Sequence, residues 1–299
     1  MMRGDVGAHP GGGPYNVART LGRLARPVRY LGCLSTDRFG LRLRSELEAD
    51  GVSLADAIAT DRPTTLALAT LDENGAASYA FYAAGTAAPA LTTTVALGAL
   101  PADLAVLHVG TLGLVFEPIA EALEAVVKAV GPDVLVVLDP NCRPPAVPDP
   151  AAYRARVARI TARADLVKVS DEDLAFLRPG EPPLEAARAL LEGGPAAVVV
   201  TRGAQGAVVV RATGEVTVPA READVIDSIG AGDAFGGGLL AWWHAHGLDT
   251  QALREGDALL DATRFGAEVA ALTVERAGAS PPRVADLPAG FDYAGVAGS

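Results

Sequence analysis

Short apolar runs alternate with longer amphipathic segments over the second half of the chain. Nearly all residues are apolar in four runs, which predicts buried strands at residues 104–109, 134–139, 166–169 and 197–201. The segments between them have apolar residues at helical spacing, which predicts helices at residues 116–130, 153–164 and 184–191. Buried strands separated by helices indicate a mostly parallel sheet that is covered by helices on both faces.

A hairpin interrupts this alternation in the first half of the chain. Residues 64–71 and 77–82 favour β structure and flank Asp72-Glu-Asn-Gly75. An Asn-Gly between two such runs is a strong hairpin signal. We therefore predict a small sheet apart from the main one, a β lid at about residues 62–84. Before it, the pattern predicts a helix at 17–25, a strand at 27–34 and a helix that ends near 50.

Composition narrows the class of protein. Of the 299 residues, 50% are hydrophobic and 20% are charged, so a large core can form. A net charge of −11 argues against a nucleic-acid partner and against a basic membrane-binding face. Cys33 and Cys142 form no CxxC pair, and no apolar run has the length of a secretory or membrane-spanning segment. A cytoplasmic protein is the expectation.

The most informative stretch is a glycine-rich turn, from Asp227 to Asp233, that runs directly into an apolar helix. The backbone amides of Gly230, Ala231 and Gly232 at a helix N-terminus can bind a phosphate or another anion. A carboxylate at Asp233 suits a base that takes a proton from a hydroxyl while phosphoryl charge develops beside it. The alternative is an aspartate cap with glycines for a tight turn.

Polar residues also follow the predicted strands, where ligands bind in parallel sheets. Asp139, Asn141 and Arg143 come after one strand, and Arg143 can hold a phosphate or carboxylate while the other two hold hydroxyls. The alternative is an Asx turn before the proline, with Arg143 in solvent.

Two further polar clusters follow strands. Ser170 to Asp173 either caps the next helix or holds Mg²⁺ through water, with Asp173 as the residue concerned. The stretch Thr201-Arg-Gly-Ala-Gln-Gly206 is either a hairpin turn or a loop beneath a nucleotide. Near the start, Gly12 and Gly13 precede Asn16 at the head of a helix, which suits sugar hydroxyls because Asn both donates and accepts. The alternative is a flexible glycine tail.

In their order along the chain, these stretches resemble the ribokinase-like carbohydrate kinases, the PfkB family. The most specific match is Asp227-Ser-Ile-Gly-Ala-Gly-Asp-Ala-Phe235, which the family usually writes DTxGAGDxF. A second match is Gly11-Gly-x-x-x-Asn16. The resemblance covers the chain from Gly11 onward and implies one domain over residues 1–299. That domain would be an α/β three-layer sandwich with a mostly parallel central sheet, flanked by helices, and a β lid.

The resemblance also implies roles for the matching residues. Asp233 would be the base, and an anion hole would be formed by Gly230, Ala231 and Gly232. Sugar would be bound by Gly12, Gly13, Asn16, Asn141 and Arg143. The nucleotide site would include Ser170, Thr201, Gly203 and Gly206. The monovalent-cation site that some members use would comprise Asp227, Ile229, Thr273, Arg276 and Gly278. The cofactors implied are ATP, Mg²⁺ and, in some members, K⁺.

The substrate is less well defined than the reaction. The string from Val167 to Leu174, with Asp139-Pro-Asn-x-Arg143, looks most like the fructokinase branch and favours fructose or a similar sugar. Ribose, a 2-keto-3-deoxy sugar acid and a nucleoside are the alternatives within the family. The partners implied are the sugar and ATP, with no nucleic acid or membrane, and the family also allows a homodimer through the lid.

The front of the chain departs from the family pattern. Members usually begin with a strand that carries a sugar-binding aspartate, and Asp5 lies too close to the glycines for that role. We expect a start codon upstream of Met1; the alternative is a truncated, impaired or purely sugar- or nucleotide-binding paralogue. A dinucleotide-binding oxidoreductase is disfavoured because Phe235 replaces the third glycine of its motif, and no Walker G-K-[ST] follows a glycine loop.

Overall fold

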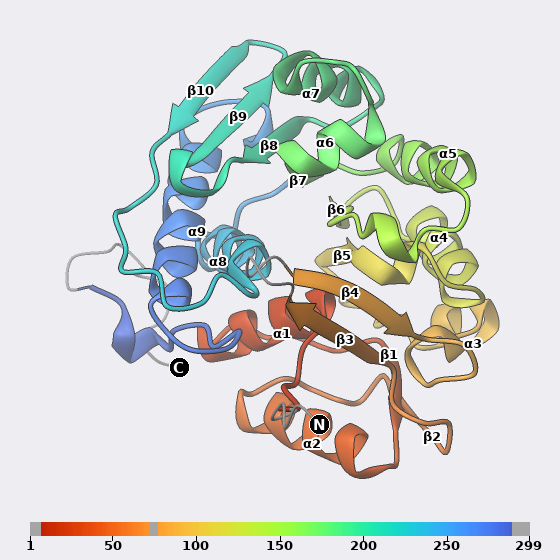
Figure 1. The fold of residues 1–299 in the computed structure, drawn as a ribbon. Helices are drawn as coiled ribbons and strands as arrows, with labels where there is room; N and C mark the ends of the chain where they lie inside the picture. The colour runs from red at the N-terminus through yellow and green to blue at the C-terminus, as the bar shows by residue number, and fades with distance from the viewer. Residues whose placement is uncertain (1–6, 72–76, 289–299) are drawn as a thin grey trace.

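A six-stranded sheet forms the middle layer of the structure (Figure 1). The computed structural model describes residues 7–71 and 77–288. The strand order is β10-β9-β8-β7-β6-β5. The strands are β5 Val106–Gly110, β6 Leu135–Asp139, β7 Leu166–Ser170, β8 Ala197–Thr201, β9 Ala207–Arg211 and β10 Gly214–Val218.

The strands from β5 to β8 run parallel, and β9 and β10 extend the sheet antiparallel to their neighbours. All five residues of β6 are buried, as expected for a strand with helices on both faces. The mostly parallel sheet predicted from the sequence is therefore confirmed. The edge strand β10 has mostly exposed or half-buried residues, so no apolar run marked it in advance.

Helices cover both faces of the sheet, which confirms the three-layer prediction (Figure 1). One layer contains α3 Thr93–Gly98, α4 Ile119–Ala129, α5 Pro150–Thr161, α6 Asp171–Leu177 and α7 Pro183–Glu192. The other contains α1 Gly13–Arg23, α8 Ala231–Ala245 and α9 Ala258–Val274, and α2 Arg38–Ala49 packs outside α1. Short 3-10 turns lie at Ala88–Ala90, Thr111–Leu114, Pro144–Ala146, Gly203–Gln205, Gln251–Leu253 and Val284–Asp286. No helix in the described part of the chain is long and apolar enough to cross a membrane.

The two helices that carry Asn16 and Asp233 begin earlier than their apolar patterns predict. Helix α1 starts at Gly13 rather than residue 17, because Pro14 is well tolerated in the first turn of a helix, where no intrahelical partner awaits its missing N–H. Helix α8 starts at Ala231, directly after Gly230 in a left-handed conformation with φ 77°. As a result, Asn16 and Asp233 both lie in first turns of helices.

The predicted hairpin is present as a separate two-stranded sheet, β3 Leu66–Leu71 and β4 Ala77–Tyr82. Its turn, at residues 72–76, lies outside the described residues. The pairing register sets Leu66 opposite Tyr82 and Leu68 opposite Ala80, so these side chains share one face of the lid.

A second small sheet pairs β1 Gly32–Ser35 with β2 Ala57–Thr60 in parallel. The strand predicted at 27–34 is therefore shorter than expected, and Arg29 makes only an isolated bridge with Ser53. Among the described residues, neither β5 nor β1 has a strand on its remaining edge, and residues 7–12 form no strand. Asp5 lies outside the described residues.

Candidate active site

Asp233 lies in the first turn of α8, at the carboxyl edge of the parallel strands, and is only 7% exposed. Two side chains from distant parts of the chain hold its carboxylate. Asn16 Nδ2 donates to Asp233 Oδ2 at 2.8 Å, and Asn141 Nδ2 donates to Asp233 Oδ1 at 3.0 Å. The structure thus joins the glycine–asparagine motif, a strand end and the glycine-rich turn at one carboxylate.

The residues predicted to form an anion hole lie at the N-terminus of α8. Gly230 caps the helix, and its φ of 77° favours a residue without a side chain. The amide of Ala231 donates back to the carbonyl of Ser228 at 3.3 Å. The first amides of a helix have no carbonyl partner within it, so Gly232 and Asp233 present theirs at the helix end.

Gly13 allows α1 to approach the site closely. A Cβ atom at Gly13 would lie 3.3 Å from Asp233 Oδ1 and only 2.3 Å from Thr111 Oγ1. Gly12, with φ 132°, is the N-cap residue of α1. Thr111 is a site residue that the sequence reasoning missed. It is 7% exposed and follows β5 directly. Its position directly after a predicted strand could have identified it.

Asn141 and Arg143 follow β6, but only Asn141 contacts Asp233. The guanidinium of Arg143 donates to the carbonyl oxygens of Asn141 at 3.2 Å and Cys142 at 2.9 Å. Its charge nevertheless contributes to lowering the pKa of Asp233. The predicted sugar-binding role of Arg143 stays a prediction.

A buried ion pair that the sequence reasoning did not identify lies close to Gly232. Lys168 Nζ lies 3.0 Å from Asp139 Oδ2, and both side chains are almost fully buried. A Cβ atom at Gly232 would lie 3.1 Å from the same ammonium. The sequence feature that could have revealed this ion pair is the single lysine inside an apolar strand, because a buried lysine needs a charged partner.

Lys168 and the nearby carboxylates influence one another's pKa values. Burial raises the pKa of Asp139 to about 6, with Lys168 opposing the shift. Burial alone would lower the pKa of Lys168, but the carboxylates of Asp139, Asp173 and Asp233 outweigh it and raise the pKa. Burial also raises the pKa of Asp233, while the hydrogen bond from Asn16 and the charges of Lys168 and Arg143 oppose it. A buried carboxylate with a raised pKa is a stronger proton acceptor once it is ionised.

The cluster after β7 caps α6, as one of the two alternatives predicted. Ser170 Oγ accepts from the amide of Asp173 at 3.0 Å, and Asp173 Oδ2 accepts from the amide of Ser170 at 3.0 Å. Asp173 Oδ1 accepts from the amide of Cys142 at 2.6 Å. Both oxygens of Asp173 are therefore engaged with the backbone, and a link to Mg²⁺ through water stays a prediction.

The loop after β8 is the turn of a hairpin between β8 and β9, which confirms that alternative. Gly206 has φ 83°, and a Cβ atom there would lie 2.1 Å from the carbonyl oxygen of Val218. The positive φ of the turn and the close approach of the end of β10 therefore account for this glycine. The nucleotide-binding roles of Ser170, Thr201, Gly203 and Gly206 stay predictions.

The predicted cation-site residues come from two segments that Asp227 ties together. Its carboxylate accepts from the amide of Ile229 at 2.9 Å and from the amide of Gly278 at 2.9 Å. Thr273 is fully buried at the end of α9, and its carbonyl accepts from the amide of Arg276 at 3.1 Å. The residues are brought together, and the role of their oxygens toward a cation stays a prediction.

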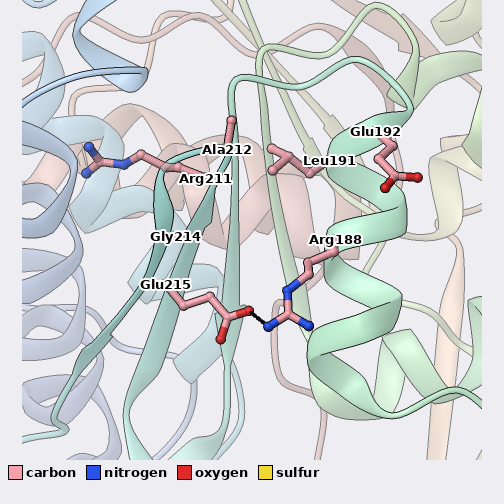
Figure 2. A pocket seen from close by; sticks show the side chains of 7 residues that line it. All are labelled: Arg188, Leu191, Glu192, Arg211, Ala212, Gly214 and Glu215. Carbon is pink, nitrogen blue, oxygen red and sulfur yellow. Dashed lines mark ion pairs between the residues drawn. The ribbon is translucent and has the colours of Figure 1, made fainter.

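A cavity of about 570 Å³ lies away from these residues, between α7 and the β9–β10 hairpin (Figure 2). Arg188 and Glu215, which both line it, form an ion pair, and Arg211 points away and donates to the carbonyl of Gly256. A smaller cavity of about 300 Å³ lies at the base of the lid and includes Phe81 and Phe116. Neither cavity is lined by a predicted site residue.

Comparisons with known proteins agree with this arrangement. Residues 3–286 match the model of the pfkB family carbohydrate kinases. The chain belongs to this family. A fructokinase from Rhizobium leguminosarum bv. trifolii is 38% identical over 265 residues, which cover 85% of this chain and 80% of that protein. The family resemblance and the assignment as a carbohydrate kinase are thereby confirmed.

Solved structures of fructokinases share the fold of this pfkB family kinase. The Xylella fastidiosa fructokinase with bound ATP has a TM-score of 0.81 and 28% identity, and the match covers 90% of this chain and 85% of that one. The Vibrio cholerae O395 fructokinase, in a form with fructose, ADP and calcium ion bound, has a TM-score of 0.78 and 29% identity, covering 90% and 86%. The ribokinase-like fold is therefore confirmed.

Proposed function

We propose that this kinase transfers the terminal phosphoryl group of ATP to a primary hydroxyl of fructose or a similar small sugar, with Asp233 as the base. One observation carries the proposal: Asn16 and Asn141 hold the buried Asp233 carboxylate at the N-terminus of α8. The similarity to fructokinases supports fructose over the other sugars. An assembled site of this kind disfavours the non-catalytic alternative.

In the proposed mechanism, the two amide groups fix both oxygens of Asp233, so the carboxylate is oriented before the sugar arrives. Asp233 accepts the proton of the attacking hydroxyl, and the phosphoryl group transfers in line without a phosphoenzyme. The helix amides near Gly230 and Gly232 and the ammonium of Lys168 stabilise the negative charge of the transferred group. Positioning and charge neutralisation supply most of the rate enhancement.

ATP and a divalent metal ion are part of the proposal, because fructokinase structures contain ATP, or ADP with calcium. The described residues include no group of three His, Cys, Asp or Glu side chains that could hold a metal by themselves. We therefore propose that Mg²⁺ binds mainly through the phosphates of the nucleotide, with Asp173 acting only through water. Such an ion would neutralise phosphate charge.

A monovalent cation is proposed at Asp227 and at the carbonyl oxygens of Ile229, Thr273, Arg276 and Gly278. The amides of Ile229 and Gly278 both donate to the Asp227 carboxylate, which supports this because these hydrogen bonds join the two segments that would supply the oxygens. K⁺ at this position would stabilise the loop that precedes Asp233.

We also propose a homodimer formed through the lid. Leu66, Leu68 and Tyr82 share one face of the β3–β4 sheet and are 46%, 43% and 60% exposed. An isolated two-stranded sheet is marginally stable, and a second copy of the same apolar face would cover it symmetrically.

The test is an ATP-consumption assay over a panel of sugars, run with and without K⁺, on the wild type and on Asp233→Asn. Fructose is expected to give the highest turnover. Asp233→Asn keeps the size of the side chain and should leave ATP binding largely intact, while kcat falls by about 10²–10⁴-fold or more. Near-normal activity in this variant would contradict the mechanism. If no sugar stimulates ATP consumption by the wild type, the non-catalytic alternative gains instead.

A further inference from the structure

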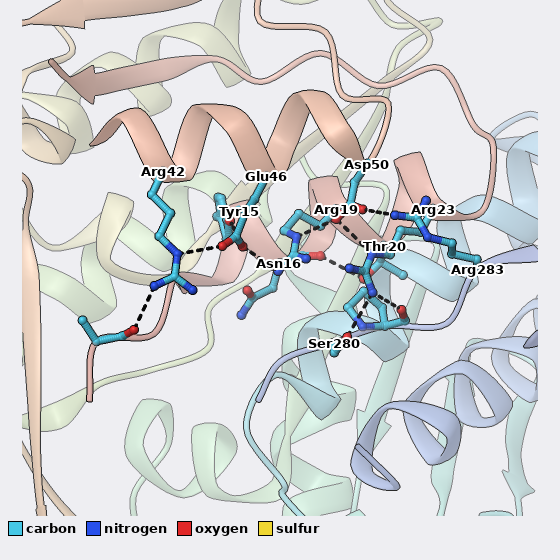
Figure 3. Close-up of polar contacts among 12 residues, drawn as sticks. Tyr15, Asn16, Arg19, Thr20, Arg23, Arg42, Glu46, Asp50, Ser280 and Arg283 are labelled. Atoms are coloured by element: carbon cyan, nitrogen blue, oxygen red, sulfur yellow. Dashed lines mark hydrogen bonds and ion pairs between the residues drawn. The ribbon is translucent and has the colours of Figure 1, made fainter. Parts of the chain in front are cut away.

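Asp50, at the end of α2, lies in a cluster of arginines that includes Arg19 and Arg23 of α1 (Figure 3). Its side chain is 2% exposed and contacts three guanidinium groups. The Nε atoms of Arg19 and Arg23 lie 2.7 Å and 2.9 Å from Asp50 Oδ2, and a terminal nitrogen of Arg283 lies 2.7 Å from Oδ1. One buried carboxylate thus joins α2, α1 and the segment after α9.

The close approach of α1 and α2 explains this geometry. Asp50 is the C-cap residue of α2. A Cβ atom at Gly22 of α1 would lie 2.2 Å from the carbonyl oxygen of Asp50, so only glycine fits there. The end of α2 therefore lies in close contact with α1, and the Asp50 carboxylate is buried among the arginines.

Arg23 extends this cluster toward the segment after α9. One of its terminal nitrogens donates to Ser280 Oγ at 3.1 Å and to the carbonyl oxygen of Pro281 at 2.6 Å. The same guanidinium therefore has Asp50 on one side and the backbone of residues 280–281 on the other (Figure 3). Such two-sided contact needs the planar fork of arginine, and a lysine ammonium at the end of a flexible chain cannot reproduce it.

The segment that Arg23 holds lies directly behind the glycine-rich turn of the active site. A Cβ atom at Gly230 would lie 2.6 Å from the Cβ of Ala279, so the two residues are in contact. The adjacent amide of Gly278 donates to Asp227 Oδ2 at 2.9 Å. Residues 278–281 therefore contact the turn from Asp227 to Gly232 and can hold it in place.

We propose that Arg23, fixed by Asp50, is a positioning residue that holds residues 278–281 against Gly230 and so fixes the amides that receive the phosphoryl group. Arg23 touches neither Asp233 nor any predicted substrate contact, and it acts only through this segment. This positioning role deepens the proposed kinase function and rests on it.

The matched pair of variants is Arg23→Lys and Arg19→Lys. Both change an arginine of α1 that contacts the same oxygen of Asp50, and both keep the positive charge. Only Arg23 reaches residues 280–281. Because small displacements at a reacting centre have large effects, Arg23→Lys should lower kcat by about 10- to 100-fold with little change in the KM for sugar, while Arg19→Lys stays near the wild type. Equal losses in the two variants would overturn the proposal.

Hydrogen exchange of the protein supplies a readout that does not need activity. Amides of residues 228–232 and 276–281 should exchange several-fold faster in Arg23→Lys than in Arg19→Lys, at matched overall stability. Unchanged exchange in Arg23→Lys, or a rise spread evenly over α1 and α2, would overturn the positioning role. A wild type without kinase activity would instead overturn the proposed function, and the exchange result would then test the positioning role of Arg23 by itself.

Ala279→Gly tests the last contact without disturbing the ionic cluster. It removes the methyl group that touches Gly230, so it should raise exchange at 228–232 and lower kcat in the same direction as Arg23→Lys. If the two act through one contact chain, the double variant should lose less than the product of the single losses. If the losses of the two single variants instead multiply, Arg23 and Ala279 do not act through the same series of contacts.

Discussion

Asp233 is subject to opposing influences on its charge. Burial raises its pKa, whereas the hydrogen bond from Asn16 and the positive charges of Lys168 and Arg143 lower it. A base must be ionised to accept a proton, and it accepts more readily when its pKa is raised. The residues around Asp233 therefore have to keep a buried carboxylate ionised at working pH.

Removal of the Lys168 charge should move the acid limb of activity. A carboxylate base loses activity as the pH falls through its pKa, and Lys168→Gln removes a charge that lowers the pKa of Asp233. The acid limb of kcat/KM against pH should therefore lie at higher pH in Lys168→Gln than in the wild type. Gln still offers Asp139 a hydrogen bond, so the buried carboxylate is not left without a donor.

Lys128→Gln is the control for this measurement. Lys128 is exposed and pairs with Glu124 on the surface of α4, so its loss should leave the pH profile unchanged. An acid limb that stays in place in Lys168→Gln would show that the ammonium does not set the ionisation of Asp233.

The sequence identified Asp233 and Asn16 but missed Lys168 and Thr111. The first two sit in glycine motifs, where backbone chemistry restricts the sequence. Lys168 sits inside an apolar strand, and its partner Asp139 lies 29 positions away, so only the parallel pairing of β6 and β7 brings the two charges together. Asn141 was identified as polar and near a strand end, but its bond to Asp233 depends on packing that no local pattern encodes.

At the scale of elements, the first turn of α1 is packed against the site too closely for a side chain at Gly13. Gly13→Ala would place a methyl group 2.3 Å from Thr111 Oγ1 and 3.3 Å from Asp233 Oδ1. α1 would have to shift and carry Asn16 with it. Displacements of about 1 Å can cost 10²-fold in rate, so kcat/KM for sugar should fall by about that factor, as measured by initial rates.

Gly11→Ala is the matched control, because a Cβ atom there meets nothing within 4 Å. It makes the same change two residues earlier and should keep kcat/KM near the wild type. Equal loss in both variants would indicate a general need for glycine in this stretch rather than a close contact at Gly13.

Apolar periodicity predicted most elements because burial produces it, and it failed where burial is partial. The strands β5 to β8 were found because most of their residues are enclosed between helices. The edge strand β10 and the six-residue helix α3 lack such a pattern and were missed. The short helix α6 was obscured because its capping residues, Ser170 to Asp173, also fit a ligand site.

At the scale of the whole molecule, the lid is a two-stranded sheet separate from the central one. Within residues 7–71 and 77–288 its strands pair only with each other, and large apolar side chains remain exposed on one face. Exposed apolar patches of this kind mark interaction sites, and two-fold symmetry lets one patch cover its own copy. The uncharged face of Leu66, Leu68 and Tyr82 suits a second lid better than a charged partner.

A charge on this face should separate the two copies of the proposed dimer. Leu68→Lys places an ammonium at a position 43% exposed in the single chain, where dimer burial would leave it without a partner. Light scattering after size exclusion should report a dimer for the wild type and a monomer for Leu68→Lys. Val216→Lys, which changes a 44% exposed residue on the edge strand β10, should stay dimeric. A monomeric wild type, or dissociation in both variants, would contradict a dimer through the lid.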